Sequence, residues 1–275
     1  MSTTPAAPAV DLAAVKRRQR TVWASGDYAA IATLIVPISE RLADAADLRA
    51  GSRVLDVATG SGNAAIAAAR MGCEVTGVDY VPALLERGRE RAAAERLAIT
   101  FTEGDVEDLP VADASYDAVT SVVGAMFAPD QRRAAAEMAR VVRPGGCVAL
   151  ASWTPEGFLG DMFRTMAAHV PPPAGVASPL MWGSEDHVAS LFGDAVRWRH
   201  RRRHFTFRFA SPERYVEMFA TTYGPTLAAM ESLDEEGRAG LAHDLAALAR
   251  RHDRLGGGGA IAIPAEYLES VGLRR

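Results

Sequence analysis

The stretch RVLDVATGSGNAAIAAA, from Arg53 to Ala69, decides the fold class of this 275-residue chain. Its apolar start predicts a buried strand, Gly60 and Gly62 predict a tight turn, and the alanine-rich remainder predicts a helix. This order is typical of nucleotide-cofactor sites, because a glycine turn lets the backbone approach a ligand and the following helix directs its positive end toward it. The stretch also poses a question, which is what kind of cofactor tolerates the acid Asp56 at the end of the strand.

The rest of the chain predicts a layered α/β protein with additions at both ends. Between 51 and 153, short apolar runs alternate with helical patterns, which predicts a parallel sheet covered by helices on both faces. Residues 11–48 show a helical pattern broken at Pro37, and Ser184 is predicted to cap a short helix over 184–193. A long strand is predicted near 195–209, helices over 211–254 and a last strand near 260–275. The predicted division is a disordered tail (1–10), an N-terminal helical cap (11–50), a cofactor-binding core (51–153) and substrate lid helices with the last two strands (154–275).

Composition excludes several classes of protein. The net charge of −4 gives no general attraction to nucleic acid or to acidic membranes. Cys73 and Cys147 lie in unrelated segments, so we expect neither a disulfide framework nor a metal site, and a reducing cytoplasm suits them. No apolar run approaches the roughly 18 residues that a membrane span needs, and the N-terminus lacks the pattern of a signal peptide. We therefore expect a cytoplasmic protein without a membrane span.

The acid before the turn bears on the choice of cofactor. Gly60, Gly62 and Ala65 match a loose dinucleotide fingerprint, which alone is a weak signal. The Asp56 carboxylate would be poorly placed beside a pyrophosphate, whereas S-adenosylmethionine (SAM) offers a sulfonium, an ammonium and only one carboxylate. Asp56 alone is equally compatible with a second role, that of a turn or helix-capping acid.

Four motifs then resemble, in order, those of class I SAM-dependent methyltransferases. They are VLDVATGSGN (54–63), VTGVD ending at Asp79, EGDVEDLP around Asp105, and VVRPGG (141–146). The motifs are closest to the small-molecule, quinone-biosynthesis-type subgroup, which VWASGDYAAIA (22–32) also resembles. The chain departs from the pattern at Ala58, where many members carry glycine, which is a common variation.

The resemblance implies a fold, a cofactor and a set of contacts. The fold is a doubly wound, mostly parallel seven-stranded Rossmann-like sheet with an N-terminal helical cap and a helical insertion between the sixth and seventh strands. Asp79 would accept both ribose hydroxyls of SAM, Asp105 the adenine amino group, and the carbonyl of Val122 the methionine ammonium, while the Val106 N–H would meet a ring nitrogen. The full expected set is Trp23, Tyr28, Asp56, Ala58, Gly60, Gly62, Asp79, Tyr80, Gly104, Asp105, Val106 and Val122, in which Trp23 and Tyr28 are equally compatible with core packing.

The implied reaction is methyl transfer from SAM, leaving S-adenosylhomocysteine (SAH), to the O, N or C atom of a small hydrophobic metabolite. Such a transfer needs alignment and desolvation, and a general base only for some acceptors. His169, His187 and Tyr223 are candidates for a base, each with an ordinary packed or surface role as the alternative. The expected substrate pocket consists of Met126, Phe127, Phe158, Met162, Phe163, Trp182 and Tyr223, each of which could instead belong to the core of the lid.

An arginine-rich run over 197–204 stands apart from these motifs. It holds five arginines and two histidines, which form either the solvated face of a long strand or a basic rim for an anionic partner or RNA. Its apolar face changes parity near 203–205, which predicts a β-bulge. His200 and His204 share a face without a third ligand, so we expect no metal. Rival hypotheses are a nicotinamide oxidoreductase, an RNA methyltransferase and a non-catalytic SAM-binding protein; the oligomeric state, monomer or homodimer, stays open.

Overall fold

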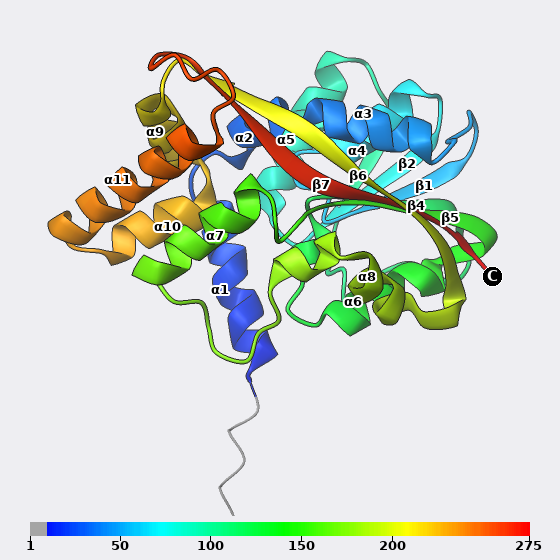
Figure 1. Ribbon diagram of the computed structural model, residues 1–275. Helices are drawn as coiled ribbons and strands as arrows, with labels where there is room; N and C mark the ends of the chain where they lie inside the picture. The colour runs from blue at the N-terminus through cyan, green and yellow to red at the C-terminus, as the bar shows by residue number, and fades with distance from the viewer. Residues whose placement is uncertain (1–9) are drawn as a thin grey trace, which may run out of the picture.

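A computed structural model describes residues 10–275 and places seven strands in one twisted sheet (Figure 1). The strand order is β3-β2-β1-β4-β5-β7-β6; the first five strands run parallel, and β7 runs antiparallel to both of its neighbours. This confirms the predicted mostly parallel, seven-stranded α/β fold. The strands are β1 (Arg53–Val57), β2 (Glu74–Asp79), β3 (Ile99–Glu103), β4 (Tyr116–Val122), β5 (Val142–Trp153), β6 (Val196–Phe209) and β7 (Ile261–Arg274).

Helices cover both faces of the sheet and extend beyond one end of it (Figure 1). One face carries α3 (Val36–Ala45), α4 (Asn63–Arg70) and α5 (Pro82–Ala94), and the other carries α6 (Gln131–Val141) and α8 (Glu185–Phe192). The central strand β1 is buried on both faces, with Val54, Leu55 and Val57 fully inaccessible, as parallel strands require. Pro37 lies in the first turn of α3, so it begins a helix where the sequence predicted only a break.

The remaining helices gather beyond the carboxyl ends of the parallel strands. They are α1 (Leu12–Ala24), α2 (Tyr28–Leu34), α7 (Phe158–His169), α9 (Pro212–Thr222), α10 (Gly224–Ser232) and α11 (Glu235–His252). The last three form the helical insertion between β6 and β7 that the sequence predicted. Three short 3-10 helices complete the described chain: Ala125–Phe127, Pro179–Gly183 and Gly193–Ala195. The tail predicted over 1–10 lies, apart from Val10, outside the described residues, and the proposed division into cap, core and lid stays a prediction.

The predicted bulge in β6 is wrong. Its pairing with β7 runs without a register shift from Val196 opposite Arg274 to Phe209 opposite Ile261. The apolar face changes because different helices cover the two halves of this long strand. Trp198 packs on Phe192 at the end of α8, whereas Phe207, on the other face, packs on Phe219 of α9. A regular strand therefore carries an apolar pattern that changes parity.

None of the helices within residues 10–275 combines the length and the apolar character that crossing a membrane requires.

Candidate functional site

A cavity lies beyond the carboxyl ends of β1, β2, β3 and β4, where open α/β sheets bind ligands. Helices α1 and α2 form its outer wall. Nine of the predicted cofactor residues line it, namely Trp23, Tyr28, Ala58, Gly60, Asp79, Tyr80, Asp105, Val106 and Val122, together with Phe127 of the predicted substrate pocket. The structure therefore brings most of the predicted site to one place, from segments spread over more than a hundred residues.

The glycine turn between β1 and α4 forms the floor of this cavity. Gly60 and Gly62 adopt positive φ angles of 55° and 85°, a region that side chains disfavour. Ala58 (φ 49°) and Val123 (φ 52°) adopt similar angles and also line the cavity. For a β-branched residue such as Val123 this conformation is strained, and strain of this kind concentrates at functional sites.

Asp56 lies behind the turn and does not line the cavity. One carboxylate oxygen accepts hydrogen bonds from Thr59 Oγ1 (2.5 Å) and the Ala65 N–H (3.1 Å), and the other from Thr120 Oγ1 (2.9 Å). The side chain is buried, and burial raises its pKa to about 6 against the effect of these bonds. The geometry thus gives Asp56 the role of the turn acid, and the expected direct contact with cofactor finds no support here.

Asp79, at the end of β2, does face the cavity. Its Oδ2 accepts from the Gly60 N–H (2.8 Å) and its Oδ1 from the Val81 N–H (2.9 Å), so the carboxylate and the glycine turn hold each other in place. Each oxygen keeps a lone pair, because a carboxylate offers about four acceptor positions. The arrangement can therefore accept a pair of neighbouring hydroxyl groups from a ligand.

Burial raises the pKa of Asp79 to about 6, despite the opposing bonds from backbone N–H groups. Because the ionised form is the one that accepts both hydroxyls, binding of SAH favours ionised Asp79. We expect the affinity measured by calorimetry to stay constant above about pH 7 and to fall below about pH 6, approaching tenfold per pH unit. Asp79→Asn should bind weakly without this inflection; an inflection kept in that variant would assign the titration to Asp56 instead.

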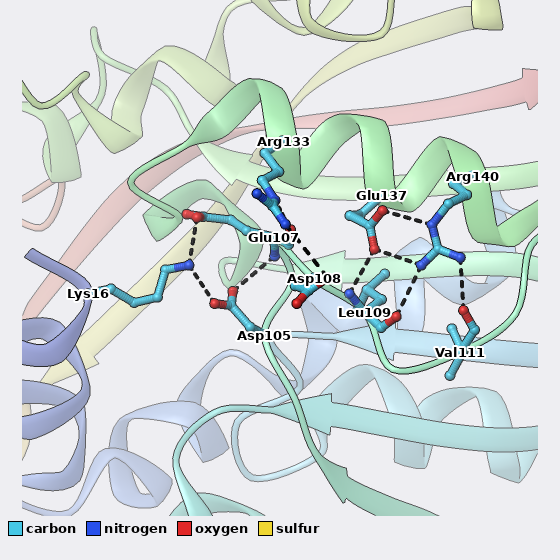
Figure 2. Close-up of polar contacts among 9 residues, drawn as sticks. All are labelled: Lys16, Asp105, Glu107, Asp108, Leu109, Val111, Arg133, Glu137 and Arg140. Carbon is cyan, nitrogen blue, oxygen red and sulfur yellow. Dashed lines mark hydrogen bonds and ion pairs between the residues drawn. The ribbon is translucent and has the colours of Figure 1, made fainter. Parts of the chain in front are cut away.

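The loop after β3 supplies Asp105, Val106 and Glu107 to the cavity, and α6 holds it from one side (Figure 2). Arg133 Nε donates to the carbonyl of Glu107 (2.5 Å), and the carboxylate of Glu137 accepts from the Leu109 N–H (2.7 Å). Arg140 bonds both that carboxylate and the carbonyl oxygens of Leu109 and Val111. From the opposite side, Lys16 of α1 pairs with the carboxylates of Asp105 and Glu107. The loop is thus fixed by charged groups on both sides.

Aromatic rings close the end of the cavity nearest α1 and α2. The ring of Trp23 lies 4.8 Å from Phe127, 5.3 Å from Tyr28 and 5.7 Å from Tyr223, each measured between ring centroids at steep angles. Edge-to-face pairs of this kind add about 0.5–1.5 kcal/mol each to the burial of the rings. Trp23 and Tyr28 therefore pack against neighbouring aromatic rings and also line the cavity. On the sequence alone, these two roles were alternatives.

Several predicted residues lie outside the cavity lining. Gly62 caps the N-terminus of α4, and Gly104 packs closely against Val78 and Pro110. Neither His169 nor His187 lines the cavity; His169 pairs with Asp244, and His187 with Gln131. Tyr223 lies one ring behind Trp23.

Most members of the predicted substrate pocket also lie behind the cavity lining. Met126, Phe158, Met162 and Trp182 are buried, and Phe163 contacts Phe127. Side chains that pack behind the wall of a pocket have the same apolar pattern as those that form it.

The lining also includes residues that the sequence interpretation missed. Thr59, Ser61 and Asn63 belong to the same motif as the predicted glycines, and Val123 and Gly124 directly follow Val122, so a longer reading of each motif would have included them. Glu107 likewise directly follows Val106 within its motif. Lys16 gave no such signal, because its partners lie 89 and 91 residues away. The described residues contain no group of three or more His, Cys, Asp or Glu side chains that could hold a metal ion.

The fold and the cavity together define an open α/β protein whose cavity lies at a glycine turn, beside the two strand-end acids Asp79 and Asp105. Residues 54–146 match the family model described as a methyltransferase domain. A demethylmenaquinone methyltransferase of Deinococcus radiodurans is 37% identical over 188 residues, which cover 66% of this chain and 72% of that protein. An uncharacterized protein of Mycobacterium tuberculosis is 45% identical over 218 residues, or 78% of this chain and 80% of that one.

The chain belongs to the class I SAM-dependent methyltransferases. The crystal structure of the YcgJ protein of Bacillus subtilis has the same fold, with a TM-score of 0.60, 21% identity, and coverage of 86% of this chain and 98% of that one. The hypothesis of a nicotinamide oxidoreductase is thereby set aside.

Proposed function

We propose that this enzyme methylates a small, apolar and electron-rich acceptor. The observation that carries the proposal is the aromatic wall of Trp23, Tyr28 and Phe127, which shares one cavity with the glycine turn and with Asp79. A wall of this composition favours flat apolar molecules over charged ones. The name of the Deinococcus relative, a demethylmenaquinone methyltransferase, supports an aromatic, quinone-derived acceptor as the first class to test.

The residues present fit SAM in their chemistry. Gly124 allows the segment after β4 to lie against the segment after β1 at the cavity, since a Cβ at Gly124 would lie 2.4 Å from the carbonyl oxygen of Ala58. Asp79 would hold the ribose hydroxyls, Asp105 and the Val106 N–H the adenine, and the carbonyl of Val122 the ammonium group. When bound, SAM supplies a sulfonium methyl group that an acceptor atom can displace in line, which leaves SAH and a methylated product.

The contribution of the chain is to align the acceptor and to exclude water. Trp23, Tyr28 and Phe127 shield the cavity, and a desolvated, correctly oriented acceptor accounts for much of the rate of such transfers. No oxyanion hole is required, because charge disperses during the displacement rather than accumulating on an oxygen.

The chemistry of the lining also restricts the acceptor. No histidine is found among the described residues of the cavity lining. Burial raises the pKa values of the Tyr28 and Tyr80 phenols, and nearby Asp79 raises them further, so both stay protonated at neutral pH and are poor bases. We therefore expect an acceptor that does not depend on a histidine or tyrosine of the lining to remove its proton. A free amine meets this condition, as does an acidic phenol whose oxygen or ring carbon reacts.

A methyl-transfer assay tests the proposal. Purified enzyme, deuterated-methyl SAM and a panel of hydroquinones, phenols, amines and carboxylates would be analysed by mass spectrometry. We expect labelled product from apolar aromatic acceptors, and binding of SAH in preference to NAD or NADP. Product formed only from charged carboxylates would contradict the proposed acceptor class. Binding of SAH without transfer to any member would favour the non-catalytic hypothesis.

The arginine-rich strand gives the RNA hypothesis no added support. It is β6, the edge strand that β5 and β7 separate from the strands around the cavity. Arg203 pairs with Glu269, and Arg202 with Glu266 and Glu156. Arg197, Arg199 and Arg201 stay exposed, as the prediction of a solvated face requires. We propose that the enzyme acts on a small molecule in the cytoplasm, which the two unpaired cysteines and the net charge of −4 favour.

A further inference from the structure

At the end of the cavity near Asp105, helix α1 contacts the core through charged side chains, whereas Trp23, farther along the helix, packs on Tyr28, Phe127 and Tyr223. None of its residues is buried, although it forms part of the wall of the cavity. Lys16 Nζ lies 2.5 Å from Asp105 Oδ2 and 2.6 Å from Glu107 Oε2, and Arg20 lies 2.5 Å from Glu103. The Arg20 pair is about half exposed and contributes little. The hold of α1 on this end of the cavity therefore depends on Lys16.

The partners of Lys16 make it more than a surface ion pair. The side chain of Glu107 is only 6% exposed; its Oε1 accepts from the Asp130 N–H, and Lys16 is the charged group on its Oε2. Burial lowers the pKa of Lys16, but its bonds to Asp105 and Glu107 outweigh this and leave the pKa raised. Removing Lys16 would leave a buried carboxylate without its counter-charge, which is costly. Lys16 is also the only lysine in the chain.

The two sides of the Asp105 loop differ in how firmly they are held. Toward the sheet, Arg133, Glu137 and Arg140 of α6 bond the backbone of the loop at several points, and α6 itself is well packed, with five buried residues (Figure 2). On the side of α1, Lys16 bonds the carboxylates of Asp105 and Glu107 (Figure 2). A movement that widens the cavity therefore displaces α1 and leaves the loop in place.

Such a movement would open the wall that α1 contributes to the cavity, which Lys16 and Trp23 line. The wall with the fewest buried residues is the one that yields most readily.

We propose that Lys16 is a positioning residue that latches α1 over the adenine end of the cofactor site, so that each exchange of SAM for SAH requires its pairs with Asp105 and Glu107 to break. This inference rests on the proposed placement of adenine at Asp105. It assigns Lys16 a role in the rate of cofactor exchange rather than in methyl transfer itself.

The single lysine allows a test without mutation. Native enzyme would be acetylated with an N-hydroxysuccinimide ester and the peptide containing Lys16 followed by mass spectrometry, with enzyme in urea as the reference. We expect labelling at least tenfold slower in the native protein, and slower again with SAH bound. Equal rates in native and unfolded protein would overturn the latch. If Lys16 is labelled slowly but at the same rate with and without SAH, the proposed link between the latch and the cofactor is overturned.

Stopped-flow release of SAH provides the second test. Lys16→Met should release SAH about tenfold faster, while Lys16→Arg should stay within threefold of the unchanged enzyme. Arg17→Met is the matched control, because Arg17 lies next along α1, is largely exposed and has only Asp11 nearby at 3.9 Å. Release from the unchanged enzyme should also quicken with added salt, and release from Lys16→Met should not.

The remaining outcomes are distinguishable. A lower melting temperature with an unchanged release rate would show that Lys16 is only structural and would overturn the proposal. If Lys16→Met does not fold, Lys16→Met/Glu107→Gln removes the buried charge as well and should show the same fast release. If the unchanged enzyme fails to bind SAH, the proposed cofactor placement fails, and the labelling experiment in urea and in buffer still decides whether Lys16 is latched.

Discussion

Replacing Asp79 by alanine should weaken the binding of SAH by ten- to a hundredfold, a loss of about 1.4–2.7 kcal/mol. Asp79 faces the cavity and has free acceptor capacity on both oxygens, and hydrogen bonds to a charged group are worth about 1.5–3 kcal/mol. Isothermal titration of SAH into the variant, at a pH above the pKa of about 6, measures the loss.

Two controls separate this effect from damage to the turn. Asp108→Ala removes an exposed carboxylate from the neighbouring loop and should leave the affinity for SAH unchanged. Asp79→Asn keeps oxygen and shape, so its melting temperature should stay closer to that of the unchanged enzyme than that of Asp79→Ala. An affinity within twofold in Asp79→Ala would remove Asp79 from the cofactor site.

Gly124→Ala should lower the affinity for SAH by more than tenfold and destabilise the fold by about 1–3 kcal/mol. A Cβ at this position would lie 2.4 Å from the carbonyl oxygen and 2.9 Å from the Cβ of Ala58. Both are parts of the glycine-turn segment that cannot move independently of the backbone. The segments that follow β1 and β4, which together line the cavity, must therefore separate.

The matched control is Gly257→Ala, because nothing lies within 4 Å of a Cβ built at Gly257. Its thermal unfolding and its affinity for SAH should match those of the unchanged enzyme. Gly124→Ala with normal affinity would show that the close approach at Ala58 is tolerated, and that the cavity does not depend on it.

The strand ends were predictable because a parallel sheet converts sequence order into spatial neighbourhood. Asp79 and Asp105 each end an apolar run, and the carboxyl ends of parallel strands meet at one edge of the sheet, so both reach the same cavity. Asp56 also lies near the end of a strand, in the motif of the glycine turn, but its side chain does not line the cavity. Its direction depends on Thr59, Thr120 and the Ala65 N–H, and Thr120 comes from a strand 64 residues later.

The substrate side was less predictable for a similar reason. Apolar spacing reports that a side chain is buried, but it does not report what covers the side chain. Trp182 and Phe158 are buried in the hydrophobic core, while Phe127 lines the cavity. The parity change in β6 had the same origin, because helices on opposite faces cover the two halves of one regular strand.

The sequence by itself determined the parallel sheet, the glycine turn, the order of the strand-end acids and the enzyme class, because these depend on local pattern and on short motifs. Only the tertiary structure decided that Asp56 supports the turn, that His169 and His187 lie outside the cavity lining, and that Lys16 reaches Asp105 and Glu107. Each of these contacts joins residues through the packing of separate elements. The distance along the chain between Lys16 and its partners carries no local signal, so the pairing exists only once α1 lies against the loop after β3.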